Sequence, residues 1–398
     1  MINPFVTTSF SMDSGERYCL VVDRTTGLPI YHPNLFITTQ LRNKSDSFST
    51  MLSAANNIAI FLNFLKDRDI NLEERILCRD LFEGYELDDL RDFTQQRFSK
   101  VSDGGVVSST THYMRLTTAA QYLSWYTNHL IGQPSSDEAK RIRRIESQIK
   151  ARRPTKKGRN KSQDRSLDDG QIEILFEVLR LGSEHNPFSE QVQRRNRLII
   201  LLLYYLGIRG GELLNLRISD INFSKSQLKV VRRADEKDDP RVQEPNAKTL
   251  ERTIPLGEVL SKELHEYILK DRRRVLEARK NDFLFITHKK GPTLGQPISK
   301  SSYYKLLNIV KFVSPELYRL TGHKLRHTWN RKFSEKMDSM DKPQSEEKQE
   351  QIRSYLMGWK QGSGTAMHYN KRFIEDKAQK AALTLQSNSG MRLPKQGL

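Results

Sequence analysis

The spacing of apolar and polar residues changes along the chain, and these changes predict its elements. Residues 1–45 hold two strand-like stretches, CLVVD and LFITT, separated by turn-forming residues, which predicts a β-hairpin. From Ser49 onward apolar residues recur at helical spacing, and further helices are predicted over Glu86–Phe98 and Ser109–Leu130. We therefore expect a small helical domain over 46–132.

The next part of the chain, 133–165, is predicted to be a charged helix followed by a basic linker. From Lys150 to Arg165 eight residues are basic and one is acidic. This composition is typical of a segment that follows a phosphate backbone, and a plain solvated tether is the alternative. The candidate DNA-contacting residues of the linker are Arg152, Arg153, Lys156, Lys157, Arg159 and Lys161.

A second domain is predicted to begin at Ser166, because Ser166 and Asp169 have the spacing of a capping box before an apolar run. A long apolar helix is expected over Glu190–Leu206, ending at Gly207. Strand-like stretches follow at Leu228–Arg232, Arg252–Leu256 and Phe283–Ile286, with helices again from about Ser302. The expected fold class is therefore mainly α with a small antiparallel β-sheet (α+β).

Charge and composition narrow the classes of partner. The chain has 398 residues, enough for two or three domains, and a formal net charge of +18. Such a charge favours a polyanionic partner, and nucleic acid fits better than a membrane surface because the basic residues are spread over the whole chain. The most apolar stretch, Leu198–Leu206, is about half the length needed to span a bilayer. The start of the chain does not have the pattern of a signal peptide.

Neither the cysteines nor the histidines predict a metal site. Cys19 and Cys78 are the two cysteines, without CxxC spacing, and this usage is typical of a reducing cytosol. The nine histidines are scattered without a metal-binding motif such as HExxH. We therefore expect no metal and no cofactor.

Two motifs place cationic side chains on turns or helix faces. In LLYYLGIRGGELLNLRISDI, Arg209 lies on the turn after a buried helix, and Glu212 opens the next short helix. A guanidinium held on such a turn can grip a phosphate through two oxygens. In TGHKLRHTW, His323 and Arg326 share one helix face, so that one can handle a proton while the other holds an anion. His327 is predicted to point elsewhere and to be structural.

Two further candidates lie in less regular segments. Tyr369 follows the end of an apolar helix and a turn rich in small residues, within LMGWKQGSGTAMHYNKRF. Lys248 falls in the turn of a predicted hairpin whose second strand is ERTIPL. Lys237 lies in the same loop region and is the alternative lysine. Each of these features alone is weak evidence of function.

The ordered set is more specific than its members. GIRGGEL, a hairpin lysine, HKLRHT, and LMGW followed by a tyrosine closely resemble the catalytic domain of the tyrosine recombinases, the phage integrase family, over roughly 166–375. The family pattern is Arg, Lys, His-x-x-Arg, His or Trp, and Tyr. This chain departs from the pattern in two places. The spacing before its tyrosine is ten residues, where about nine is usual, and the polar stretch Glu335–Gln351 makes the gap between Arg326 and Trp359 longer than usual. The matching positions are Arg209, Lys248, His323, Arg326, Trp359 and Tyr369, with Glu212 as the acidic residue that supports the first arginine.

The resemblance implies a reaction without metal or cofactor, in which a tyrosine attacks a DNA phosphodiester and forms a phosphotyrosine. Arg209 and Arg326 would stabilise charge on the phosphoryl oxygens, and Trp359 would add an indole N–H. Tyr369 would be the nucleophile. His323 would accept its proton, and Lys248 would protonate the leaving oxygen.

The resemblance also implies a domain organisation and partners. The helices over 46–132 resemble the family's core-binding domain by position and pattern. The expected partners are double-stranded DNA recombination sites, three further copies of the chain in a tetramer, and accessory DNA-bending proteins, in a bacterial cytoplasm at the nucleoid. The tail 376–398 is expected to extend a helix, Phe373–Leu385, that docks on a neighbouring copy.

Several functions share these residues. A mobile-element integrase is the expected role, while a type IB topoisomerase, a telomere resolvase or a tyrosine transposase would use the same site. A DNA-binding protein that has lost catalysis is an alternative from another class. A basic RNA-binding protein is disfavoured, because the sequence has no aromatic-rich motif for stacking bases.

Overall fold

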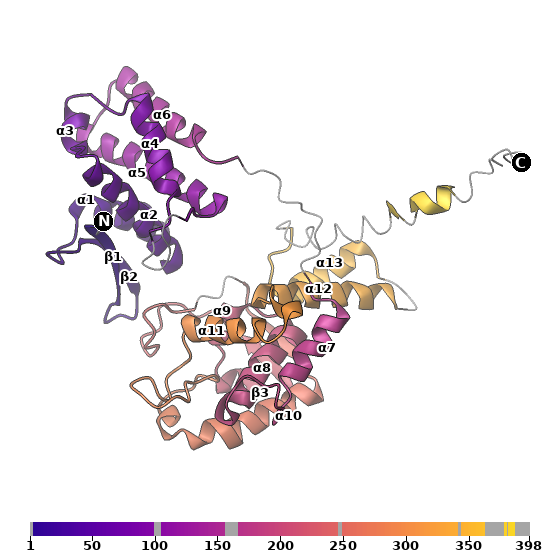
Figure 1. Ribbon diagram of the computed structural model, residues 1–398. Coiled ribbons are helices and arrows are strands. Elements are labelled where there is room, and N and C mark those ends of the chain that lie inside the picture. Colours follow the sequence, from indigo (N-terminus) through magenta and orange to yellow (C-terminus); the bar gives the residue numbers. More distant parts are fainter. Residues whose placement is uncertain are drawn as a thin grey trace, which may run out of the picture. The chain divides into compact units, whose positions relative to one another are not determined.

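The computed structural model describes residues 3–98, 105–155, 166–245, 249–340, 344–362, 378–379 and 381–386. The chain forms two compact units, both built mainly from helices (Figure 1). The first is Met1–Lys161 together with Asp235–Asp238, and the second is Ser162–Ala234 together with Asp239–Leu398. The fold is thus mainly helical with small antiparallel sheets, which confirms the predicted class.

The first unit opens with a β-hairpin, but its strands are not the two predicted. The stretch CLVVD lies in β2, as expected, and pairs antiparallel with β1, so that Phe5 is opposite Asp23. The stretch LFITT is helical, which corrects the prediction. The hydroxyls of Thr38 and Thr39 donate to carbonyls four residues earlier, at 2.8 Å each, so these β-branched residues are satisfied in a helix. Phe36 packs edge-to-face on Tyr122, and this burial decides the conformation.

The helices predicted for the first unit are present, although the one predicted over Glu86–Phe98 covers Gly84–Gln95. One core contains side chains from the hairpin as well as from these helices, so the segment 1–45 packs together with the helices that follow it. Arg17 of β2 also holds the short segment Asp235–Asp238, through a bond of 2.7 Å from its guanidinium to the Glu236 carbonyl. The elements are β1 Phe5–Ser11, β2 Arg17–Asp23, α1 Tyr31–Phe36, η1 Ile37–Leu41, η2 Arg42–Lys44, α2 Phe48–Asp67, α3 Leu72–Leu77, α4 Gly84–Gln95, α5 Ser109–Ile131 and α6 Ser136–Ala151.

Helix α2 is the one helix in the described part of the chain that is long and apolar enough to cross a membrane. Half of its most apolar stretch is buried inside the protein, and core helices of water-soluble domains can be equally long and apolar. Its residues Ile58, Phe61 and Phe64 lie fully buried in the core of the first unit.

The second unit is arranged around α8. Six consecutive residues, Leu198–Leu203, are buried, so this helix is covered on all sides, and α10 and α12 pack against it. The predicted helix Glu190–Leu206 is confirmed at both ends. The elements are α7 Asp169–Val178, α8 Glu190–Leu206, α9 Gly210–Leu214, η3 Ile218–Asp220, β3 Ile221–Asn222, β4 Gln227–Val230, β5 Arg252–Pro255, α10 Glu258–Glu266, η4 Tyr267–Asp271, η5 Arg272–Arg274, η6 Leu276–Lys280, α11 Lys300–Lys311, η7 Pro315–Leu317, α12 Gly322–Asp338 and α13 Glu346–Met357.

Two local predictions for this unit were wrong. The sheet has the order β3-β4-β5, and the third predicted strand, Phe283–Ile286, makes only isolated bridges. Its four side chains are all buried, so the apolar run reflects core packing and not a ladder. The capping box of α7 is formed by Asp168 and Gln171. Ser166 does not cap the helix, and it lies buried.

Candidate active site

The turn after α8 is shaped by a glycine. Gly207 ends the helix in the left-handed conformation, with φ +60°. A Cβ at this position would lie 2.8 Å from both the Met357 Cε and the Trp329 Cγ atoms. Only glycine therefore allows α8 to end here while α12 and α13 pack against its last turn.

Arg209 caps the short helix α9, and Glu212 sits on that helix as its buried partner. The Arg209 backbone N–H donates to the Glu212 carboxylate at 3.0 Å, and the guanidinium Nη1 lies 3.8 Å from it. About a third of the Arg209 side chain, 34%, stays exposed, whereas that of Glu212 is fully buried. The backbone of Arg209 is thus held by Glu212, while part of its side chain remains accessible.

Arg252 and Thr249 complete the surroundings of Glu212. Arg252, at the start of β5, donates to the carboxylate at 2.8 Å, and the Thr249 hydroxyl also donates to it. Burial alone would raise the pKa of the Glu212 carboxyl, but Arg252, Thr249 and Arg326 together outweigh burial and hold that pKa below its usual value. Glu212 therefore stays ionised and links the Arg209 turn to the β5 strand.

Arg326 is held by the ends of two helices. Its side chain is buried, with 1% exposed, and donates to the Gly207 carbonyl at 2.6 Å and to the Met357 carbonyl at 3.0 Å. These carbonyls end α8 and α13, where the helix dipoles are negative, so the positive charge is stabilised there. The guanidinium also lies 5.4 Å from the centre of the Trp359 ring.

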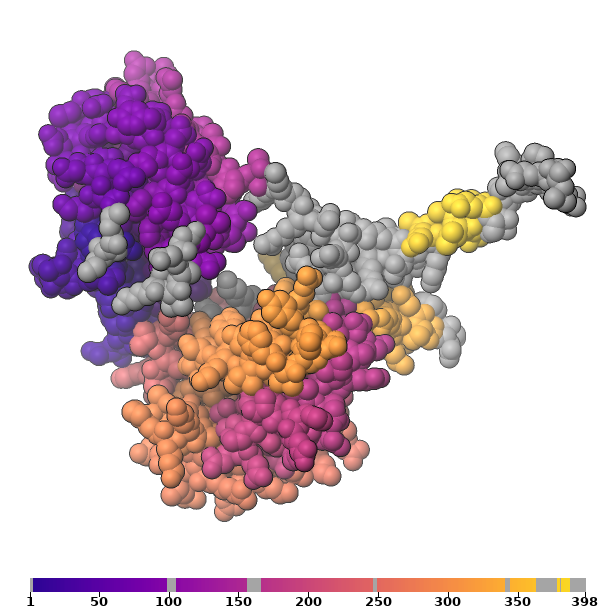
Figure 2. All heavy atoms as spheres, viewed as in Figure 1, coloured from indigo at the N-terminus to yellow at the C-terminus, as the bar shows by residue number. Residues whose placement is uncertain are grey.

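Arg209, His323 and Arg326 line one pocket of about 290 Å³. The pocket runs along α11, which lies at the surface of the second unit (orange in Figures 1 and 2). Lys300 and Lys311 of that helix add two more cationic groups, and none of the described lining residues is acidic. Three residues predicted from two separate motifs thus meet in a positively charged recess. That combination suits an anion such as a phosphate.

The remaining predicted residues of this unit have different placements. Trp359 is buried against Met357 and Trp329, next to Arg326. The ring of His327 lies edge-on to that of His323, with centroids 4.5 Å apart. Lys248 and Tyr369 lie outside the described residues.

The neighbours of Lys248 on both sides are anchored near α9. Asn215, which follows α9, donates to the Pro245 carbonyl, and Thr249 donates to Glu212. The Leu250 backbone N–H donates to the Gly358 carbonyl at 2.9 Å. The alternative lysine, Lys237, belongs to the segment Asp235–Asp238 of the first unit.

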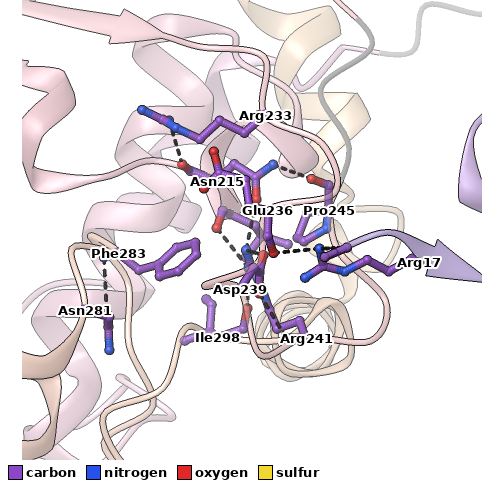
Figure 3. Close-up of polar contacts among 12 residues, drawn as sticks. Arg17, Asn215, Arg233, Glu236, Asp239, Arg241, Pro245, Asn281, Phe283 and Ile298 are labelled. Carbon is purple, nitrogen blue, oxygen red and sulfur yellow. Dashed lines mark hydrogen bonds and ion pairs between the residues drawn. The ribbon is translucent and has the colours of Figure 1, made fainter. Parts of the chain in front are cut away.

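Arg241, a buried arginine, fixes the loop that precedes Lys248 in the sequence (Figure 3). Arg241 pairs with Asp239 at 2.6 Å, donates to the carbonyls of Leu214 and Ile298 at 3.0 and 3.1 Å, and reaches the Asn215 side chain at 2.9 Å. It therefore ties the loop to the end of α9, where Leu214 lines the pocket, and to the segment that precedes α11.

The basic linker is only partly described. Arg152 pairs with Asp88 at 2.8 Å and donates to the Gln148 carbonyl. Arg153 lies over the Tyr113 ring at 4.4 Å and donates to the Lys150 carbonyl. Both guanidinium groups thus secure the end of α6. The other four linker residues named above, Lys156, Lys157, Arg159 and Lys161, lie outside the described residues.

Sequence reasoning missed Arg252, Arg241 and Tyr303, a buried residue of α11 that lines the pocket. Strand alternation could have indicated Arg252, because it shares a face with the buried Ile254. Helical spacing could have placed Tyr303 with Leu306, Leu307 and Val310. No local pattern marks Arg241. Within the described ranges, no group of three or more His, Cys, Asp or Glu side chains is placed to hold a metal ion.

Comparisons with known proteins bear on the second unit above all. The family model of the phage integrase family matches residues 167–375, more than half of the chain. Tyrosine recombinase XerD of Halalkalibacterium halodurans is 28% identical over 159 residues, covering 40% of this chain and 45% of that protein. Transposase A from transposon Tn554 of Staphylococcus aureus is 34% identical over 137 residues, covering 34% and 35%. The chain spans about half the length of the first of these relatives.

A solved structure shows the same fold over most of the chain. The XerH site-specific recombinase bound to its difH substrate matches with a TM-score of 0.52 and 19% identity, covering 86% of this chain and 84% of that one.

Proposed function

Because the chain belongs to the phage integrase family of tyrosine recombinases, we propose that it cuts and rejoins DNA strands at specific sites through a 3′-phosphotyrosyl intermediate. The observation that carries this proposal is the pocket in which Arg209, His323 and Arg326 converge, and whose described lining residues include no acidic side chain. A phosphodiester resists attack because of its negative charge, and two guanidinium groups offset that charge.

The two arginines would stabilise the charge that develops on the phosphoryl oxygens. Arg326 suits this role because two helix ends fix it before any ligand binds, so little reorganisation is needed. Arg209 reaches the pocket from the turn between α8 and α9, and its guanidinium lies near the Glu212 carboxylate. Trp359, beside Arg326, would add an indole N–H donor.

Tyr369 would be the nucleophile. Free tyrosine has a pKa of about 10 and is mostly protonated near neutral pH, so it needs activation. The cationic pocket would favour the phenolate, and the exposed His323 would accept the proton. The attack forms a bond from the phenol oxygen to phosphorus and releases a 5′-oxygen. The reverse step, by a hydroxyl of another strand, would complete the exchange.

Lys248 would protonate the leaving 5′-oxygen. Its support is the anchoring of Pro245 and Thr249 to Asn215 and Glu212, since consecutive Cα atoms are about 3.8 Å apart. Lys237 has no comparable anchoring to Asn215 or Glu212, since its segment Asp235–Asp238 is held by Arg17 of the first unit.

The wider architecture is part of the proposal. Residues 46–132 would be the core-binding domain, 133–165 a linker along the DNA backbone, 166–375 the catalytic domain, and 376–398 a tail that docks on another copy. Four copies would assemble on two double-stranded DNA sites, assisted by DNA-bending proteins, in a bacterial cytoplasm. The net charge of +18 supports a polyanionic partner. Affinity should then fall with salt, with a log–log slope of about −0.9 per phosphate contacted.

A mobile genetic element is the proposed setting. The likeness to transposase A of Tn554 supports this role and keeps transposition as the second candidate. A chromosomal role such as that of the Xer recombinases is the other outcome. Direct repeats flanking an inserted element in the genome would favour integration.

A covalent adduct tests the proposed chemistry. The full-length protein is incubated with a nicked duplex whose recognition sequence has first been selected from random DNA, and SDS-resistant protein–DNA adducts are counted. We expect an adduct with the wild type, none with Tyr369→Phe, and a normal yield with Tyr355→Phe, an exposed tyrosine of α13. Salt-sensitive binding without any adduct from the wild type would instead identify a DNA-binding protein that has lost catalysis.

A further inference from the structure

Tyr303 occupies an unusual position between two glycines. It belongs to α11, and only 5% of it is exposed. A Cβ on Gly210 would lie 2.8 Å from its hydroxyl oxygen, and a Cβ on Gly322 would overlap that oxygen. Gly210 follows Arg209, and Gly322 precedes His323. The hydroxyl is therefore inserted between the two segments that carry these pocket residues.

The hydroxyl faces the pocket and not a protein partner. Tyr303 lines the same pocket as Arg209, His323 and Arg326. Within the described ranges the hydroxyl makes no hydrogen bond to the protein, and it is not one of the fully buried polar atoms that lack a partner. The hydroxyl is therefore accessible from the pocket, and a ligand bound there can accept its hydrogen bond.

We propose that Tyr303 is a further catalytic residue, whose hydroxyl donates a hydrogen bond to a non-bridging oxygen of the scissile phosphate. This inference rests on the proposed function, because it takes the occupant of the pocket to be a phosphodiester. Tyr303 would thus add a neutral donor to the two guanidinium groups. Its ring is held by the core around α11, so the donor is positioned before DNA binds.

Tyr303 acts as a donor and does not compete with Tyr369 as nucleophile. Burial raises the pKa of Tyr303 far above its ordinary value, so its hydroxyl keeps the proton at neutral pH. The two glycines are a consequence of this placement. A side chain at 210 or 322 would push the phenol out of the gap.

Removing the hydroxyl alone tests the proposal. Tyr303→Phe keeps the ring and loses the donor, and Tyr318→Phe is the control, since this tyrosine of the same unit is exposed and is not part of the pocket lining. The selected nicked duplex described above serves as substrate for the full-length protein. We expect the single-turnover rate of adduct formation to fall roughly tenfold to a hundredfold in Tyr303→Phe and to stay unchanged in Tyr318→Phe. Affinity for an intact duplex and the Tm should match those of the wild type.

A modified phosphate identifies the oxygen that is contacted. Sulfur accepts hydrogen bonds more weakly than oxygen, so one of the two phosphorothioate stereoisomers should slow the wild type but add little to the loss in Tyr303→Phe. An unchanged rate in Tyr303→Phe would overturn the proposal. A loss of rate that comes with a lower Tm would also overturn it. The same holds if the loss of rate in Tyr303→Phe adds fully to the effect of each phosphorothioate stereoisomer. If Tyr369→Phe still formed the adduct, the proposed function itself would fail, whatever the result at Tyr303.

Discussion

Arg209 and Arg326 line the same pocket but are held in different ways. Arg326 is buried and fixed by carbonyls at the ends of α8 and α13, which belong to the core of the unit. Arg209 caps a five-residue helix, keeps a third of its side chain exposed, and depends on the Glu212 carboxylate. One side of the pocket is therefore built by helix packing, and the other by a network of charges around a single carboxylate.

This difference allows the effect of a substitution on stability to be distinguished from its effect on activity. A change at Arg326 removes a charge from the pocket and also leaves two helix ends without their donor. A change at Arg209 removes a charge from a partly exposed position. The two arginines should thus give similar losses of activity but very different losses of stability, and this contrast can be measured.

The largest effects are expected from replacing each arginine by alanine. Arg326→Ala and Arg209→Ala should each slow adduct formation by about 10²–10³-fold, the usual cost of losing one charge stabiliser. Arg326→Ala should also lower the free energy of unfolding by about 3–5 kcal/mol, because it deletes two charge-assisted hydrogen bonds and leaves a cavity. Arg209→Ala should stay within about 1 kcal/mol of the wild type. Urea unfolding followed by tryptophan fluorescence, in a Trp125→Phe background, reports on the second unit alone.

Arg326→Lys sharpens this comparison. Lysine keeps the charge but has no planar fork, so it cannot hold both carbonyls in the geometry of arginine. It should recover part of the activity and little of the stability. Equal losses of stability in Arg209→Ala and Arg326→Ala would contradict the distinction between the two sides.

The Arg209 side should respond to pH through Glu212, whereas the Arg326 side is held by carbonyls that do not titrate. The pKa of Glu212 is lower in the folded protein than its ordinary value, so its contribution to stability is present above that value and is lost as the pH falls through the folded pKa. Glu212→Gln breaks the buried pair with Arg252 and should cost about 3–5 kcal/mol at pH 7.

This cost should shrink on acidification, because the protonated carboxyl of the wild type resembles the amide of the variant. Unfolding free energies of the wild type and Glu212→Gln, measured between neutral pH and pH 3, should therefore converge below the ordinary glutamate pKa of about 4.3. Asp220→Asn is a useful control, since Asp220 pairs with Arg233 away from the pocket lining. A cost that stays constant with pH would show that the charge of Glu212 does not hold this side together.

Residues of the candidate site could be predicted from the sequence more readily than the residues that hold them in place. Arg209, His323 and Arg326 could be assigned because each lies at a fixed place in a short motif, and the structure brings them to one pocket. Their partners could not, because Arg252 meets Glu212 across forty positions of sequence. The carbonyls that hold Arg326 lie on two other helices. Such contacts depend on how helices pack, which local spacing does not encode.

The fold shows the same limit. The long helix Glu190–Leu206, with its regular apolar spacing, was predicted to the residue. The stretch LFITT was mistaken for a strand because its β-branched residues favour one, while burial of Phe36 and Ile37 in the first core made it helical. Propensity was overruled by tertiary packing where the segment was short.

The smallest effect concerns the glycine whose carbonyl holds Arg326. Gly207 and Gly182 both have left-handed backbones, at φ +60° and +72°, so alanine costs each of them about 1 kcal/mol of backbone strain. A Cβ at 182 meets nothing within 4 Å, whereas one at 207 presses on Met357 and Trp329. Gly207→Ala should therefore lose about 1–3 kcal/mol more stability than Gly182→Ala. It should also slow adduct formation, because the shifted turn moves the acceptor of Arg326. If the two variants lost equal stability and kept full activity, close packing at the end of α8 would not be what positions this arginine.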